Sequence, residues 1–329
     1  MGSAATTGRP SRHRTGRSSL GHGIVFAKAA RRPDDRGDLA HEATVYGLLH
    51  GGNCPHTERC TPRGVRWDPK TGELAMEALD APDLAQAVAD TGRLDVDAAE
   101  ALGRVVARLH VEGGLLDADA PSSAWTVGGI DWHRPGPAHL RVLSGGGIEL
   151  LEMLQRSERL WAHLARVARP SDADTLVHGD LRWENVLVAE EPDPPRIWLV
   201  DWEFAGIGES AWDVGCFAAA CVSGWLSSIP HVPGVPPARL LDEAALPMDA
   251  IRPGLAAFWT GYGEISRPGL DGWRDRCIEL TATRLVHLAF EATTGDEQLR
   301  ACPVAHLQVA LHMLDGPTRA AEELLGLPW

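Results

Sequence analysis

The segment from Val177 to Val188 constrains the fold of this chain more than any other. It reads Val-His-Gly-Asp-Leu-Arg-Trp-Glu-Asn-Val-Leu-Val, so Asp180 and Asn185 stand five residues apart in a loop that enters an apolar strand. A second apolar run, residues 197–200, leads directly into Asp201. The pattern predicts two short strands with carboxylate and amide side chains at their ends.

These residue types suit phosphoryl transfer. The reaction needs positioning, Mg²⁺ to neutralise the phosphates, and a carboxylate that orients the incoming hydroxyl. Asp180 can accept the hydroxyl proton, while Asn185 and Asp201 offer the hard oxygen ligands that Mg²⁺ requires. The alternative is a polar turn whose carboxylates are only solvated. The coincidence of several motif members in the right order argues against that alternative.

The order H-G-D-x-x-x-x-N, an apolar strand and D resembles the aminoglycoside phosphotransferase family, relatives of the protein kinases, and residues 201–215 extend the match. The resemblance implies an α+β, two-lobed protein-kinase-like fold with ATP and Mg²⁺ as cofactors. It also implies that Asp180 is the catalytic base, that Asn185 and Asp201 hold the metal, and that Asp213 braces the catalytic loop.

Two further residues of this segment have expected roles. Arg182 stands where protein kinases commonly place a lysine against the γ-phosphate, so it is expected to stabilise charge in the transition state. A surface ion pair is its alternative role. His178 is expected to hold the loop by hydrogen bonds rather than to act as a base. The tryptophans are expected in the core or in a cleft wall: Trp183, Trp202, Trp212 and Trp225.

The upstream part of the resemblance depends on a rare residue. Among the 31 basic residues only Lys28 and Lys70 are lysines, and Lys28 ends the apolar run 24–27. The resemblance implies that Lys28 contacts the α- and β-phosphates and that Glu42, on a helix, is its ion-pair partner. Each could instead be a solvated surface charge. Residues 76–79 resemble the hinge that reads adenine, which places Glu77 and Leu79 beside the nucleotide.

The nucleotide loop departs from the family pattern. No G-x-G-x-x-G precedes Lys28, and Gly21-His22-Gly23 is expected to form only a turn between strands. Residues 12–19 occupy the place of the missing loop, within a polar segment, 1–20, that is expected to be a loose tail or mobile loop. This departure keeps open a function of another class, a pseudokinase that acts as a binding module.

The chain order predicts two lobes. Residues 1–79 are expected to form a strand-rich nucleotide-binding lobe, and residues 80–329 a mainly helical lobe with the catalytic loop and the acceptor site. Strands are expected at 24–28, 63–67, 73–79, 186–188 and 197–200. Helices are expected at 38–50, 84–88, 96–110 and 148–168, from 211 onward, and from about 304, with irregular chain at 113–147.

Composition excludes several classes. A formal net charge of -14 disfavours a nucleic-acid partner. No apolar run approaches the roughly 18 residues of a membrane span, and no secretory signal is visible. The six cysteines lack metal-binding spacings, which favours reduced thiols in a cytoplasmic protein.

The acceptor is expected from a narrower resemblance. Residues 202–230 resemble a bacterial subgroup in thioamitide and class V lanthipeptide pathways, which implies that Ser or Thr of a precursor peptide is phosphorylated before a separate lyase-like partner eliminates phosphate. An open groove should then lead to Asp180, flanked by Arg182 and Trp183, and helix 148–168 should help wall it. The alternative is a small-molecule O-phosphotransferase acting on an aminoglycoside, a macrolide or a similar compound.

Overall fold

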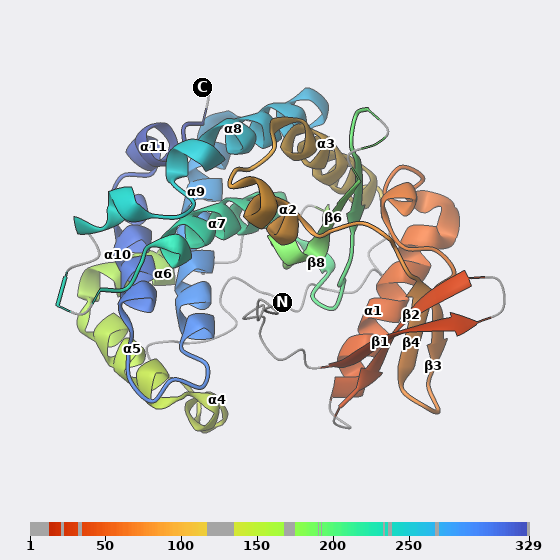
Figure 1. Cartoon of the computed structure of the whole chain (residues 1–329), viewed down its shortest axis with the longest axis horizontal. Helices are drawn as coiled ribbons and strands as arrows, with labels where there is room; N and C mark the ends of the chain where they lie inside the picture. The colour runs from red at the N-terminus through yellow and green to blue at the C-terminus, as the bar shows by residue number, and fades with distance from the viewer. Residues whose placement is uncertain are drawn as a thin grey trace.

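An antiparallel sheet occupies one end of the molecule and helices occupy the other (Figure 1). The computed structural model describes residues 13–20, 23–31, 35–116, 135–167, 175–189, 191, 193–232, 234–235, 239–266 and 270–327. The fold is α+β, as predicted, and the order of a strand-rich part followed by a helical part is also as predicted.

The sheet has four antiparallel strands in the order β1-β2-β4-β3. They are β1 (His13–Leu20), β2 (Gly23–Ala30), β3 (Arg66–Asp68) and β4 (Glu73–Glu77). Burial alternates along β4, where Leu74 and Met76 point inward. Helix α1 (Arg36–Leu48) packs against β2, β3 and β4. Because the sheet is anchored in this way, Lys28 has a fixed place on β2, opposite Leu74.

Strand β1 corrects the expectation of a loose segment. Residues 13–20 pair with β2 along their whole length, from His13 opposite Ala30 to Leu20 opposite Gly23. An antiparallel ladder needs only backbone groups, so a polar sequence can form an edge strand whose side chains stay exposed at 14–17. Residues 1–12, and residues 21–22 of the expected turn, lie outside the described residues.

The described residues of the remaining chain form helices and two short antiparallel strand pairs. The helices are α2 (Leu84–Thr91), α3 (Val96–Gly113), α4 (Pro137–Val142), α5 (Gly145–Arg156), α6 (Glu158–Val167), α7 (Ser210–Ser228), α8 (Met248–Ile265), α9 (Leu270–Ala292), α10 (Ala301–Asp315) and α11 (Pro317–Arg319). Strand β5 (Thr175–Val177) pairs with β8 (Gly206–Gly208), and β6 (Val186–Ala189) pairs with β7 (Arg196–Leu199).

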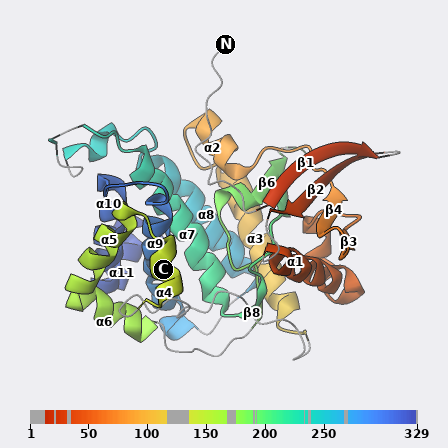
Figure 2. The same cartoon turned by 90° about the horizontal axis from the view of Figure 1, so that it is seen from below.

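Close packing between helices builds the core of the helical part. Helix α7 is buried on nearly all sides and packs against α9, while α3 packs along α8 (Figure 2). The α3–α8 contact is close because Gly103 faces the carbonyl oxygen of Phe258, which would lie 2.1 Å from a Cβ at this position. The apolar faces of these helices form one core with the residues under the sheet.

Two helix predictions need correction. The single helix expected at 148–168 is two, α5 and α6, separated at Ser157. The Ser157 hydroxyl accepts a hydrogen bond from Leu160 N at 3.3 Å, and such a cap favours a new helix start. Within the segment expected to be irregular, α4 begins with Pro137, a residue suited to the first helical turn. Residues 117–134 lie outside the described part.

None of the helices in the described ranges combines the length and apolarity that a bilayer crossing requires. All six cysteines lie in the described ranges and are free thiols.

Candidate active site

The two strand pairs bring the predicted oxygen donors together. Strand β5 leads into the loop with Asp180, a 3₁₀ turn (Trp183–Asn185) leads into β6, and β7 delivers Asp201. Asn185 Nδ2 donates to the backbone oxygen of Asp180 at 2.8 Å and approaches its Oδ2 at 3.4 Å. The backbone oxygen of Asn185 accepts from Val200 N at 3.0 Å. The loop and the end of β7 are therefore joined directly.

Asp213 braces the catalytic loop, as predicted. Its carboxylate accepts from His178 N at 2.7 Å and Gly179 N at 2.9 Å, and it lies 3.1 Å from His110 Nε2. Burial alone would raise the pKa of the Asp213 carboxyl, but the hydrogen bonds from His110 and His178 outweigh burial and hold that pKa below its ordinary value. The brace is thus an ionised, fully buried carboxylate on α7.

The backbone at Gly179 requires glycine. Its φ is +84°, and a Cβ would lie 2.4 Å from the carbonyl oxygen of Phe204. His178 Nε2 lies 3.0 Å from the Val200 carbonyl oxygen, the loop-holding hydrogen bond expected of this residue. Trp212 Nε1 donates to the Gly179 carbonyl oxygen at 2.8 Å. The turn before Asp180 is therefore fixed from three sides.

Lys28 and Glu42 form the predicted ion pair, and both face Asp201. Lys28 Nζ donates to both Glu42 carboxylate oxygens at 2.8 Å and to Asp201 Oδ1 at 2.6 Å. Burial would lower the pKa of the Lys28 amine, but the two carboxylates raise it well above its ordinary value. Burial likewise opposes ionisation of Asp201, yet Lys28 holds its pKa below the ordinary range. Strand β2, helix α1 and the end of β7 meet at these charges.

Asp201 also has an unusual backbone. Its φ of +69° lies in the left-handed region, which non-glycine residues rarely adopt and Asp tolerates better than most. Such a conformation costs on the order of 1–3 kcal/mol and persists only where the surroundings impose it. Outliers of this kind cluster at functional sites, which supports a site at the end of β7.

Asp180 also contacts a buried arginine to which no sequence motif pointed. Arg284 on α9 is 3% exposed and donates to Asp180 Oδ1 at 2.7 Å and Glu291 Oε1 at 2.9 Å. Burial would lower the pKa of the Arg284 guanidinium, but the carboxylates of Glu291 and Asp180 outweigh burial and raise that pKa above its ordinary value. A charged residue among the buried positions of a helix was the available signal, because an arginine is seldom buried unless it is paired.

In the structure Arg182 makes ion pairs, as in the alternative considered for it. Its guanidinium pairs with Glu184 at 2.8 Å and approaches Glu291 at 3.7 Å. The predicted role of Arg182 at a transferring phosphate stays a prediction. Arg182 and Arg284 share Glu291, so positive and negative charges alternate beside Asp180.

Trp183 does not flank a groove, contrary to expectation. It is 8% exposed, and its ring packs so closely on α7 that a Cβ at Gly224 would lie 2.6 Å from Trp183 Cη2. A large apolar ring next to a glycine gains more by burial than by lining an open channel. Trp202 and Trp212 are also buried, which confirms the core alternative for all three.

The expected hinge residues lie at the end of β4 and just beyond it. Glu77 ends β4 and accepts from Arg63 N at 3.0 Å through Oε2. The carbonyl oxygen of Leu79 accepts from Arg17 NH2 of β1 at 3.1 Å. Their contact with a nucleotide stays a prediction.

Two carboxylates and an amide, with a buried lysine in contact with one of the carboxylates, are the residue types of a kinase-type phosphotransferase site. Residues 17–253, more than half of the chain, match the phosphotransferase enzyme family (APH), and the chain belongs to this family. No curated protein sequence matches the chain significantly.

Solved kinase structures share the fold at low sequence identity. Choline kinase LicA from Streptococcus pneumoniae is 12% identical with a TM-score of 0.55, over 94% of this chain and 91% of that chain. The microcompartment-associated aminopropanol kinase is 15% identical with a TM-score of 0.53, over 94% and 92%. Glucosamine kinase in complex with glucosamine, ADP and inorganic phosphate is 18% identical with a TM-score of 0.53, over 95% and 82%. These similarities confirm the predicted kinase-like fold.

Proposed function

We propose that this phosphotransferase moves the γ-phosphoryl group of ATP, with Mg²⁺, to a hydroxyl group held at Asp180. The observation that carries the proposal is a pair of contacts, Lys28 with Asp201 and Asp180 with Asn185. A backbone hydrogen bond from Val200 N to Asn185 O joins the two segments that carry these pairs. A pseudokinase would have no reason to keep both of these pairs, which is why binding without transfer is the weaker alternative.

Each of these residues has a stated task. Asp180 orients the acceptor hydroxyl and takes its proton. Lys28 contacts the α- and β-phosphates, and Glu42 holds its ammonium in place. Arg182 stabilises charge as the phosphoryl group moves. Residues 1–79 form the nucleotide lobe, with adenine at Glu77 and Leu79. Residues 80–329 form the acceptor lobe. The ADP in the glucosamine kinase supports a nucleotide in this fold.

The residues present fit Mg²⁺. Asn185 donates through Nδ2, so its amide oxygen is the atom that can meet a cation. Asp201 is ionised because Lys28 holds its pKa low. Both donors are hard oxygens, as Mg²⁺ prefers. When bound, the ion neutralises phosphate charge.

The favoured acceptor is a small molecule with a hydroxyl. The kinases named above act, by their names, on choline, aminopropanol and glucosamine, all compact compounds. Beside Asp180, the carboxylates of Glu184 and Glu291 are offset by Arg182 and Arg284. This balance suits a neutral or singly charged acceptor better than a polycationic aminoglycoside, which needs unpaired acidic side chains.

A peptide Ser or Thr is the second candidate, although the comparisons lend it no support. It is favoured by a depression of about 770 Å³ between the C-terminal end of α7 and the start of α10. Ser227 lines this depression. It lies on α7 three residues after Gly224, and Gly224 packs on Trp183, which is close to Asp180 in the chain. An extended peptide buries more surface than a compact ligand, and a depression of this size can accommodate one.

The deciding experiment offers Mg-ATP and a panel of acceptors to the purified full-length chain. The panel holds small amino alcohols, an amino sugar, an aminoglycoside, and a candidate precursor peptide with its lyase partner, and mass spectrometry detects an added phosphate. Asp180→Asn is the matched control. Transfer to a compact hydroxyl compound supports the favoured acceptor. A phosphate adduct or loss of water on the peptide supports the second. Mg-ATP binding without transfer to any acceptor would favour the pseudokinase, and no nucleotide binding would overturn the proposal.

A further inference from the structure

Helix α1 holds the segment 201–205, which begins with Asp201, at two points. Near the start of the segment, Trp202 N donates to Glu42 Oε1 at 3.3 Å. At its end, His41 Nε2 lies 2.6 Å from the carbonyl oxygen of Ala205. The chain between these points is a turn, because Ala205 N donates to the Trp202 carbonyl oxygen at 3.1 Å. Two neighbouring residues of one helix therefore fix both ends of one turn.

The carbonyl of Ala205 decides the direction of the His41 hydrogen bond. A carbonyl oxygen only accepts, so His41 Nε2 carries the hydrogen and donates it. Ala205 is fully buried and His41 is half-buried, so water cannot readily replace this donor at the carbonyl. The bond therefore ties the end of the turn to α1.

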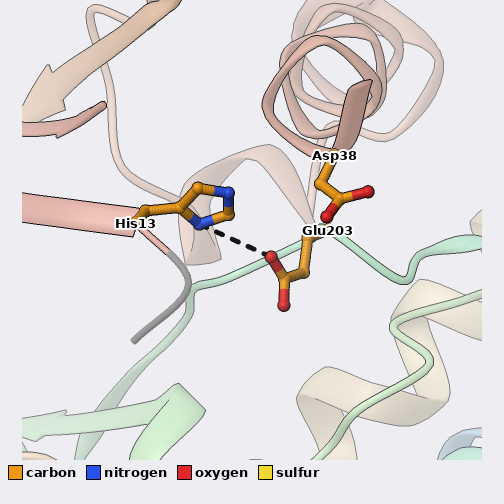
Figure 3. A group of neighbouring side chains, drawn as sticks. All are labelled: His13, Asp38 and Glu203. Atoms are coloured by element: carbon orange, nitrogen blue, oxygen red, sulfur yellow. Dashed lines mark ion pairs between the residues drawn. The ribbon is translucent and has the colours of Figure 1, made fainter. Parts of the chain in front are cut away.

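Strand β1 lies against the same segment. Figure 3 shows Glu203 beside His13 at the start of β1 and beside Asp38 in the first turn of α1. His13 Nδ1 lies 3.6 Å from Glu203 Oε2. The segment that follows β7 thus contacts both β1 and α1, two elements of the strand-rich part of the chain.

The conformation of Asp201 depends on the turn that follows it. Its φ of +69° is rare for a residue other than glycine, and such a conformation persists only where the surroundings impose it. The bonds at Trp202 and Ala205 fix the chain immediately after Asp201. They therefore help to set the direction of its carboxylate, whose Oδ1 accepts from Lys28 at 2.6 Å.

We propose that His41 is a positioning residue for Asp201. It acts through the turn: its hydrogen bond holds Ala205 against α1, which keeps the Asp201 carboxylate where it is to meet Mg²⁺. The inference rests on the proposed function, since it takes Asp201 as a metal ligand. Because Glu42 is the next residue of α1, a movement of this helix would shift the ion pair of Lys28 and the metal ligand together.

The test compares the affinity for ATP with and without Mg²⁺, measured by calorimetry on the full-length chain. His41→Leu removes the donor, whereas His41→Gln keeps an amide N–H that can reach the same carbonyl. His41→Leu should weaken the binding of Mg-ATP by roughly 10-fold, as is usual when a residue that orients a metal ligand is lost. The affinity for ATP without metal should stay unchanged, and His41→Gln should recover most of the affinity for Mg-ATP.

His50→Leu is the matched control. His50 is also a half-buried histidine, just after α1, but its Nε2 lies 2.8 Å from Thr61 Oγ1 and not beside the segment 201–205. Loss of that bond should lower stability and leave the Mg²⁺ dependence of ATP binding as in wild type. A purely structural role of His41 would give His41→Leu the same pattern as His50→Leu.

Three results would overturn the proposal: unchanged Mg-ATP affinity in His41→Leu, an equal loss with and without Mg²⁺, or no recovery in His41→Gln. If His41→Leu does not fold, His41→Asn takes its place, since its shorter side chain holds the amide farther from the carbonyl.

Amide hydrogen exchange of the free chain separates this proposal from the proposed function. The amides of Trp202 and Ala205 should exchange faster in His41→Leu than in wild type and His41→Gln, and equal exchange in all three would show that His41 does not hold the turn. A wild-type affinity for ATP that does not depend on Mg²⁺ would instead count against the proposed function, at Asp201 itself.

Discussion

The two sides of Asp180 are built differently. On the nucleotide side, Lys28, Glu42 and Asp201 meet at distances of 2.6 to 2.8 Å, and the family resemblance pointed to each of them. On the other side, Asp180 contacts Arg284 of α9, a residue that no sequence motif predicts. In the proposed function the nucleotide side handles phosphates and a metal, whose chemistry is the same for every acceptor. The α9 side can vary with the acceptor, so its residues follow helix packing and not a fixed spacing.

The largest expected effect lies at the residue that both sides share. Asp180→Asn removes the carboxylate that takes the hydroxyl proton, so turnover should fall by roughly 10²–10⁴-fold. Arg284 keeps Glu291 as a partner, so the variant should fold. Turnover is measured with saturating Mg-ATP, and circular dichroism is the folding control. Near-wild-type turnover would show that Asp180 is not the catalytic base. The two sides of Asp180 could then not be compared as parts of one active site.

Breaking the nucleotide side should remove metal-dependent binding. Asp201→Ala takes away the charged metal ligand, so the affinity for Mg-ATP should fall by roughly 100-fold, while Lys28 keeps Glu42. Asn185→Ala should be milder, since an amide brings no charge. Calorimetry with and without Mg²⁺ gives both affinities. Equal affinity in wild type and Asp201→Ala would contradict a kinase-type metal site.

Breaking the α9 side should act on the acceptor step and on stability. Arg284→Met leaves Asp180 and Glu291 without their buried cation, at a cost of about 3 kcal/mol in the free energy of unfolding. The affinity for Mg-ATP should change little, because Lys28 and Asp201 are untouched. Urea unfolding and calorimetry separate the two readouts. Arg156→Met is the control, since its ion pair with Glu152 is exposed. A variant that loses nucleotide affinity but not stability would show that the two sides are not separable.

The smallest expected effect is on stability, from a change at Asp213, which holds the backbone of His178 and Gly179. Asp213→Asn keeps the shape but loses the charge that accepts two backbone N–H groups, at a cost of about 1–3 kcal/mol near neutral pH. Because the pKa of Asp213 is lowered in the folded chain, its contribution is present above the ordinary Asp pKa of about 3.9 and is lost as the pH falls further. The stability difference from wild type should therefore shrink below about pH 4. A difference independent of pH would show that the ionised form does not matter.

The sequence predicted the catalytic loop, the ion pair and the brace because each depends on a few residues at fixed spacing. It also predicted the helix at 96–110, because the apolar period of 3.6 that buries Leu102, Val106 and Leu109 on α3 is local information. Strand β1 was missed because its pairing with β2 is made by backbone groups under polar side chains. Arg284 was missed because its contact with Asp180 spans 104 residues and depends on how α7 and α9 pack.

The burial of Lys28 has a consequence for chemical labelling. The only other lysine, Lys70, is exposed in the turn between β3 and β4. An acylating reagent modifies neutral amines, so Lys70 should react first, while Lys28 is protected by its raised pKa and its carboxylate partners. Acylation of Lys28 would then report how often the ion pair opens, with Lys70 in the same molecule as the internal reference. The chain's preference for arginine thus leaves two amine side chains in contrasting environments, and a single mass spectrum can follow both.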